Sequence, residues 1–272
     1  MEEERTAETL AKIQQTVREI FLVIDETAKK AGVPYYLFYG SALGAVRHQG
    51  FIPWDDDGDI VMFREDYEQL RAYWLGHPVE GYFFQDEQTD PGYNLRITKI
   101  RKDNTAFVEP SVKDRHMHHG FFVDIFVLDD YVKNGFLRRV GELISLCDFN
   151  AVRGYCPPSG LAKAVYSVTN RLFKGRGLCK FWFKKIYPRL KKDPALCTDL
   201  ASPSFRKSYN YRREWFGKPR YVKFDQYLLP IPQNAEATLT EGYGDFMTPP
   251  PPEQQQGHHH FFKLSFTEGY QP

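Results

Sequence analysis

Residues 39–60 read YGSALGAVRHQGFIPWDDDGDI, and this stretch decides the fold that we expect. The apolar, aromatic run Tyr35–Tyr39 leads into it and predicts a short buried strand. Gly40 and Ser41 then open a predicted helix over residues 42–47, with Ser41 as its N-cap. A strand that ends in Gly-Ser at the start of a helix presents backbone N–H groups to an anion. Gly40 and Ser41 are therefore candidates for binding a phosphate group.

The acidic end of this stretch places four carboxylates within five residues, at Asp55, Asp56, Asp57 and Asp59. We predict a strand over residues 57–63, and because side chains alternate along a strand, Asp57 and Asp59 should point the same way. Two like charges about 4 Å apart repel by roughly 4 kcal/mol at an effective dielectric constant of about 20. Such a pair needs a proton or a cation between its members, and oxygen ligands favour Mg²⁺, Mn²⁺ or Ca²⁺ over zinc.

A further carboxylate, Asp124, lies within Phe121–Leu128, an apolar run typical of a strand buried on both faces. An ionised carboxylate there is costly unless it is paired or binds a metal. If Asp124 faces Asp57 and Asp59, the three form a metal site that neutralises phosphate oxygens and activates an attacking hydroxyl. Two alternatives stay open: a salt-bridge or capping partner would also satisfy Asp124, and a solvated acidic turn would explain the other two.

The remaining pattern predicts a single α/β (α+β) domain over residues 1–272, with its chemistry in the first half. Apolar residues at three- and four-residue spacing predict an amphipathic helix over 3–31, ended by Gly32 and Pro34. A second helix is predicted over 64–74, and further strands over 81–85, 93–101 and 121–128.

The second half differs in charge, because residues 149–192 hold eleven Lys or Arg and no Asp or Glu. We predict a basic helical subdomain inserted over about residues 135–200, with helix over 161–190 broken at Gly175 and Gly177. Two interpretations stay open: a solvated basic face, or a surface that contacts a membrane of anionic lipid or a phosphate-bearing polymer. The Pro- and Gln-rich tail, residues 245–257, predicts a loose or wrapping segment.

Composition narrows the class of protein. Thirty-six basic and 35 acidic residues in a chain of 272 give a net charge of +1, which argues against a nucleic-acid partner. The sequence has no run of about 18 apolar residues, so we expect no transmembrane helix. Its acidic start is unlike a secretory signal. Four cysteines without a C-x-x-C pair suit a reducing compartment. We expect a cytoplasmic protein, peripheral at the inner face of the membrane if the basic stretch binds lipid.

An apolar strand, Gly-Ser, a helix and two Asp separated by one residue together resemble the nucleotidyltransferase-fold signature. Within that fold, residues 39–60 resemble the LicD family of phosphocholine transferases, which includes the fukutin-related proteins. Blocks at 99–105, 122–129 and 243–250 and the pair His258-His259 match as well. The resemblance implies a mixed sheet flanked by helices, a Mg²⁺ (or Mn²⁺) ion and a CDP-activated donor such as CDP-choline. It also implies a glycan or lipid-linked glycan acceptor, as in lipopolysaccharide or teichoic acid modification.

Carried onto this sequence, the resemblance makes Asp57 and Asp59 the metal-binding pair and Asp124 the third carboxylate, all three catalytic. Asp55, which follows Pro-Trp, would reach the metal through water. The chain departs from the family pattern at Gly58, where a branched apolar residue usually separates the two aspartates, so the strand should start late or bend there. Val127 replaces a common proline. Neither departure removes a ligand.

Cations near these blocks are candidates for holding the phosphate oxygens of the substrate. Arg47 lies one short helix after Gly40, and Lys99 and Arg101 share one face of the predicted strand over 93–101. The alternative for each is an ordinary surface charge. His258 and His259 are candidates for the rim of the site.

Three other functions compete with phospho-alcohol transfer. A nucleotidyltransferase would share the metal carboxylates but use a nucleoside triphosphate and release pyrophosphate instead of CMP. A glycosyltransferase with an Asp-x-Asp motif normally places a larger nucleotide-binding half before the pair than the 56 residues that precede Asp57. A non-catalytic glycan-binding relative would have no use for clustered charges at Asp57, Asp59 and Asp124.

Overall fold

The computed structural model describes residues 6–93, 95–153, 159–173, 176–200, 210–257 and 259–272. The chain divides into two compact units. The first comprises Met1–Tyr93, Ile97–Val127 and Glu214–Pro272, and the second comprises Asn94–Arg96 and Leu128–Arg213.

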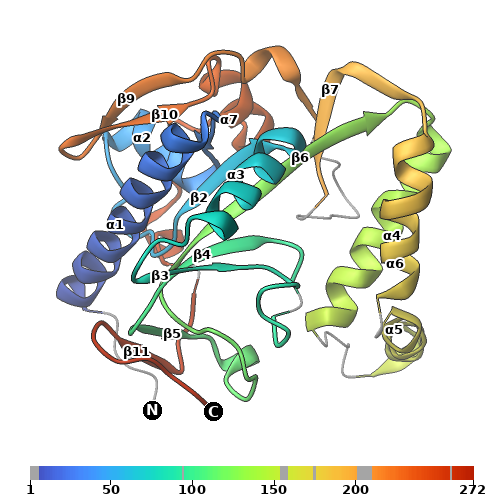
Figure 1. Cartoon of the computed structure of the whole chain (residues 1–272), viewed down its shortest axis with the longest axis horizontal. Helices are drawn as coiled ribbons and strands as arrows, with labels where there is room; N and C mark the ends of the chain where they lie inside the picture. Colours follow the sequence, from blue (N-terminus) through green and yellow to red (C-terminus); the bar gives the residue numbers. More distant parts are fainter. Residues whose placement is uncertain (1–5, 94, 154–158, 174–175, 201–209, 258) are drawn as a thin grey trace. The chain divides into compact units, whose positions relative to one another are not determined.

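A mixed sheet carries the fold, which confirms the predicted α/β class. Among the described residues, its strands follow the order β1 (Tyr36–Leu37), β2 (Asp59–Phe63), β6 (Phe122–Val132), β4 (Thr98–Lys102) and β3 (Tyr82–Gln85). Two further strands, β7 (Lys192–Asp199) and β8 (Asn210–Arg212), extend it from β6. The order brings β2, β6 and β4, which are distant in sequence, side by side in the first unit (Figure 1).

Helices α1 (Ala7–Ala31) and α3 (Arg64–Gly76) pack against each other and against strands of this sheet (Figure 1). α1 begins after Thr6, whose side chain caps the Thr9 N–H group, and ends at Gly32 in the left-handed conformation. Its apolar stripe enters one large core with the strands, as the three- and four-residue spacing predicts.

The start of helix α2 (Tyr39–His48) corrects the sequence prediction. The helix begins at Tyr39, two residues before Ser41, so Phe38 is the N-cap residue and Ser41 is not. Tyr39 has a positive φ of 41°, and its ring packs edge-on against Phe126 at 5.0 Å between centroids. Ser41 is buried inside the first turn instead of capping it.

The strand boundaries also differ from the predictions. β2 begins at Asp59 and not at residue 57, so Asp57 precedes the strand. β4 begins at Thr98 and not at residue 93, and β6 extends to Val132. The remaining elements of the first unit are β5 (Ala106–Val108), η1 (Pro110–Val112), η4 (Arg213–Trp215, shared with the second unit), β9 (Arg220–Phe224), β10 (Tyr227–Ile231), α7 (Ala235–Tyr243), η5 (Pro252–Gln254) and β11 (Lys263–Ser265).

The second unit is helical where the basic stretch predicts helix. It contains α4 (Gly135–Arg153), α5 (Gly160–Phe173), α6 (Gly177–Phe181), a π-helical turn η2 (Trp182–Ile186) and η3 (Tyr187–Arg189). The predicted break at Gly175 lies outside the described residues, and Gly177 is the first residue of α6. Among the residues that the structure describes, none of the helices combines the length and the apolar character needed to cross a membrane.

Candidate functional site

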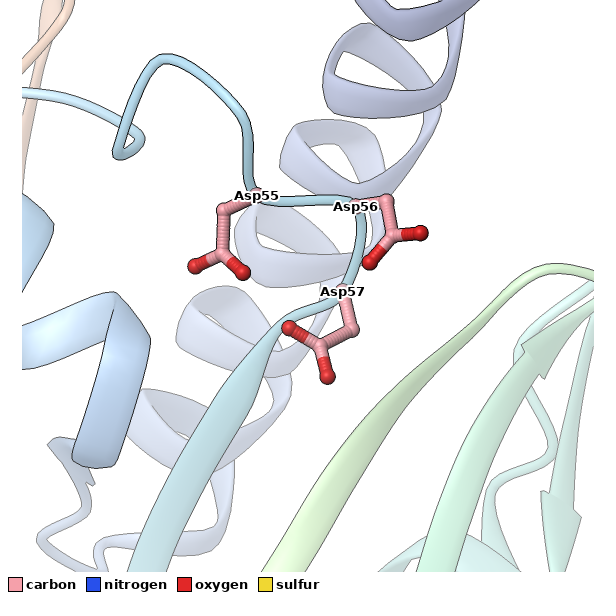
Figure 2. Close-up of side chains that lie close together, drawn as sticks. All are labelled: Asp55, Asp56 and Asp57. Carbon is pink, nitrogen blue, oxygen red and sulfur yellow. The ribbon is translucent and has the colours of Figure 1, made fainter. Parts of the chain in front are cut away.

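The acidic residues before β2 form a tight cluster in the first unit. Asp55, Asp56 and Asp57 each offer one carboxylate oxygen, and these atoms all lie within 4.8 Å of one another. Figure 2 shows the three side chains on the turn that leads into β2. Asp55 and Asp56 are buried and Asp57 is half-buried. We call these three residues the acid loop.

Two glycines make room for the acid loop. A Cβ atom on Gly40, in the first turn of α2, would lie 2.7 Å from Oδ2 of Asp55. A Cβ atom on Gly58 would lie 2.6 Å from Val17 and 2.7 Å from Phe21, both on α1. Gly58, the departure from the family pattern, is thus the residue that allows the chain to pass α1 closely before β2 begins.

Asp59, the first residue of β2, is buried beside this loop. Its backbone N–H group donates a 2.9 Å hydrogen bond to Oγ of Ser41. Burial raises the pKa of the Asp59 carboxyl well above its usual value, and the charges of Asp57 and Asp124 raise it further. Burial, followed by the neighbouring carboxylates of the acid loop, likewise raises the pKa of Asp55. Ser41 therefore joins α2 to the strand that carries the metal-ligand candidate Asp59.

Asp124 enters the same region from β6, where its N–H group donates a 2.8 Å hydrogen bond to the carbonyl of Gly58. Lys99 is its cross-strand neighbour on β4, and the two side chains form a buried ion pair. Burial raises the pKa of Asp124, and the charge of Lys99 opposes that shift. Burial lowers the pKa of Lys99. The salt-bridge partner that the sequence left open as an alternative for Asp124 is therefore present.

His259, from the C-terminal region of the chain, contacts two residues of the acid loop. His259 Nε2 lies 3.1 Å from Oδ2 of Asp57, and Nδ1 lies 3.3 Å from Oε1 of Glu109. The His259 backbone N–H group donates to Asp56 at 3.3 Å. Burial alone would lower the pKa of His259, but the hydrogen bonds and charges of Asp57 and Glu109 raise it to about 10. Burial would raise the pKa of Glu109, but the bond to His259 and nearby cations lower it to about 2.

The candidate phosphate-binding cations have protein partners. Arg101 is buried and donates from Nε to Oε1 of Gln85 and from a terminal nitrogen to the carbonyl of Gly120, each at 2.5 Å. Arg47 donates to the carbonyl of Phe246 at 2.7 Å and contacts His48.

Three residues around the acid loop were missed or underused by the sequence analysis. Asp56 is a full member of the cluster, and Glu109 and His259 bracket it. The four-carboxylate run already contained a signal for Asp56, but the sequence analysis assigned it no role. His258, the other predicted rim residue, lies outside the described residues.

The residues present fit a divalent metal ion. The donor set consists of carboxylate oxygens, which suit Mg²⁺ or Mn²⁺. Burial among like charges raises the pKa of Asp55 in this set and of the neighbouring Asp59, so a cation bound there would stabilise their ionised forms. Asp55, Asp56 and Asp57 could hold such an ion directly, with Asp59 and Asp124 beside them.

A mixed sheet whose second strand follows a Gly-Ser helix and begins beside clustered carboxylates agrees with the resemblance to the nucleotidyltransferase fold. Residues 32–143 match the nucleotidyltransferase domain of the LicD/FKTN/FKRP family, which confirms the resemblance to the LicD family. That segment contains the acid loop, Asp59, Lys99, Glu109 and Asp124, whereas His259 lies beyond it.

One relative extends the similarity over most of the chain. The chain is 27% identical over 251 residues to the lipopolysaccharide cholinephosphotransferase LicD of Haemophilus influenzae, covering 88% of this chain and 91% of that protein. It is 37% identical over 91 residues to the human ribitol 5-phosphate transferase FKRP, covering 32% of this chain and 18% of that protein. An uncharacterized protein of Rickettsia prowazekii is 32% identical over 105 residues, which is 36% of this chain and 38% of that protein.

Proposed function

We propose that this chain transfers a phospho-alcohol group, most simply phosphocholine, from a CDP-activated donor to a hydroxyl of a cell-surface glycan or its lipid-linked precursor. The acceptor oxygen forms a bond to the phosphorus that carries the alcohol, the bond from that phosphorus to CMP breaks, and the hydroxyl proton passes to a protein base. The clustered carboxylates of the acid loop beside Asp59 carry this proposal. The names of two relatives support it, since one transfers cholinephosphate and the other ribitol 5-phosphate.

We propose Asp55, Asp57, Asp59 and Asp124 as the residues that hold a Mg²⁺ or Mn²⁺ ion, and we add Asp56 from its place in the acid loop. Bound there, the ion would neutralise charge on the donor's phosphates and acidify the acceptor hydroxyl.

We propose the first turn of α2 as the binding site for the phosphates of the donor. Gly40 and Ser41 lie in this first turn, where the positive end of the helix dipole favours an anion. Gly40 faces the carboxylate of Asp55 without a side chain between them. A phosphate at this turn would therefore approach the acid loop closely.

Asp124 is the proposed base. Burial raises its pKa, which improves a carboxylate as a proton acceptor from a hydroxyl. Lys99 orients Asp124 through their ion pair and balances its charge before the proton arrives. Arg47 and Arg101 donate hydrogen bonds to backbone carbonyls of the protein. Their proposed role is therefore to attract the anionic donor through their positive charge.

Thermal-shift measurements with CDP-choline, CDP-ribitol, CDP-glycerol, CTP and UDP-glucose, each with and without Mg²⁺, test the proposal. A ligand at 100 times its dissociation constant stabilises a protein by about 2.7 kcal/mol. We expect a Mg²⁺-dependent shift with one CDP-alcohol, followed by release of CMP when an acceptor glycan is added.

Asp57→Asn should lose both the shift and CMP release. Asp25→Asn is the matched control, because Asp25 is a buried, ion-paired aspartate on α1, outside the acid loop, and it should keep both. A shift with CTP and release of pyrophosphate would establish a nucleotidyltransferase instead. An Asp57→Asn variant that keeps its rate would remove the acid loop from the reaction.

A further inference from the structure

Helix α5 in the second unit presents an apolar ridge to solvent. Leu161, Val165, Val168 and Leu172 are 83%, 50%, 60% and 68% exposed. Their spacing of four, three and four residues aligns them along one side of the helix, within an arc of about 60°. We call these four residues the α5 ridge.

The α5 ridge is not the side by which α5 packs into its own unit. The packed side contributes Phe173, which is buried in a small core with Ile144 of α4 and Cys179 of α6. Figure 1 shows α5 beside α4 and α6 within this unit. The helix is therefore apolar on two sides, and the residues that the structure describes cover the Phe173 side but leave the α5 ridge exposed.

Helix α6, which packs against α5, also has exposed apolar side chains. Leu178 and Phe181, three residues apart on that short helix, are both about half-exposed. Single exposed apolar side chains are ordinary, but a contiguous set marks a surface that meets an apolar partner.

The stretch of chain that contains α5 and α6 is strongly basic. Exposed cations within residues 159–173 and 176–191 are Lys163, Arg171, Lys180, Lys184, Lys185, Arg189 and Lys191. Residues 149–192 contain no carboxylate, and the two acidic residues of α4 are already neutralised. Glu142 pairs with Arg139 at 2.8 Å, and Asp148 pairs with Arg176 at 3.1 Å. Residues 149–192 therefore carry a large net positive charge.

We propose that the α5 ridge and these cations bind this unit to the surface of an anionic lipid bilayer. Apolar side chains on one side of a helix with cations around them are the features of a helix that lies in the membrane interface. Arg171 lies about 100° around the helix from Leu172, where its long side chain can reach lipid phosphates while the ridge enters the acyl boundary.

The positive charge of this surface also favours an anionic bilayer over a second copy of the chain as its partner. Two identical surfaces, each carrying the same excess of cations, would repel each other on contact. A bilayer containing acidic phospholipid attracts such a surface by about 1 kcal/mol per cation near it. This proposal does not depend on the proposed transferase reaction, because it concerns the second unit alone.

Vesicle flotation of the full chain tests the proposal. We expect binding to phosphatidylcholine vesicles that contain phosphatidylglycerol, weak binding to phosphatidylcholine alone, and loss of binding at high salt. The double variant Leu161→Gln/Leu172→Gln should bind anionic vesicles at least about tenfold more weakly. The matched control is Leu228→Gln on β10, since Leu228 is 63% exposed in the other unit, and its binding should equal that of the unmodified protein.

A second variant, Lys180→Gln/Lys184→Gln, should also weaken binding and flatten its salt dependence. Circular dichroism melting curves confirm that each variant is folded. Equal binding by the ridge variant and by Leu228→Gln would overturn the proposal, as would salt-independent binding to phosphatidylcholine. Light scattering that shows a dimer lost in the ridge variant, without vesicle binding, would assign the ridge to a second copy instead.

Discussion

Replacing Lys99 by methionine tests how much the buried ion pair with Asp124 contributes to the stability of the protein. The change removes the cation that pairs with Asp124 across β4 and β6, yet it keeps a side chain of similar length, so little cavity is created. Both groups are buried. Removing one partner of a buried ion pair costs about 3–5 kcal/mol. Because burial already raises the pKa of Asp124, protonation relieves part of that cost, and we expect a loss of about 3 kcal/mol.

The assay is urea denaturation at neutral pH in a chelating buffer, on a double-mutant cycle. Its members are the unmodified protein, Lys99→Met, Asp124→Asn and the double variant. The double variant should be more stable than Lys99→Met, since it no longer buries an uncompensated carboxylate. Lys102→Met is the matched control: Lys102 lies on the same strand and pairs with Glu19, but both groups are partly exposed. That pair should contribute at most about 1 kcal/mol.

The reasoning would be refuted in either of two ways. If Lys99→Met costs no more than Lys102→Met, the pair with Asp124 is not buried in solution. If the double variant is no more stable than Lys99→Met, the cost comes from packing and not from an uncompensated charge.

Three further predictions concern the frame of the site. Gly58→Ala should destabilise the protein by about 1–3 kcal/mol, because the added Cβ would overlap two side chains of α1. Gly76→Ala is the control and should not destabilise the protein, because the space around Gly76 is open. Thermal melting curves compare the two variants. Ser41→Ala removes the acceptor of the buried Asp59 N–H group and should cost about 1–3 kcal/mol in urea denaturation. In a chelating buffer, the stability that His259 provides relative to His259→Gln should be complete below pH 6.5 and should disappear as the pH rises through about 10, the folded-state pKa.

The elements that the sequence predicted well are those with a strong local pattern. The apolar spacing of α1 and its Gly32 stop are local features, and so is the acidic run at residues 55–59. These signals place a Gly-Ser helix and a carboxylate-rich strand in order, which suffices for the fold class. They do not fix where β2 begins, because the close approach of Gly58 to α1 is a tertiary contact.

Partners across strands could not be predicted from the sequence. Lys99 and Asp124 meet through the register of β4 on β6, and register depends on the assembled sheet. From the sequence, Lys99 was therefore predicted to bind a phosphate, and the partner of Asp124 stayed undecided between a metal ion and a salt-bridge or capping group. Ser41 was misjudged for a related reason: serine at a helix start usually caps, whereas here its hydroxyl accepts from a strand 18 residues away.

The acid loop also shows why a motif alone underdetermines a site. The motif supplies like charges, and the groups that offset them come from elsewhere in the chain. Lys99 on β4 meets Asp124, and His259, 202 residues from Asp57, bridges the loop to Glu109. These two cations face more carboxylates than they can balance, and burial raises the pKa of the Asp55 and Asp59 carboxyl groups. The surplus of negative charge supports the proposed divalent ion, because such an ion brings two positive charges to one point and prefers oxygen ligands.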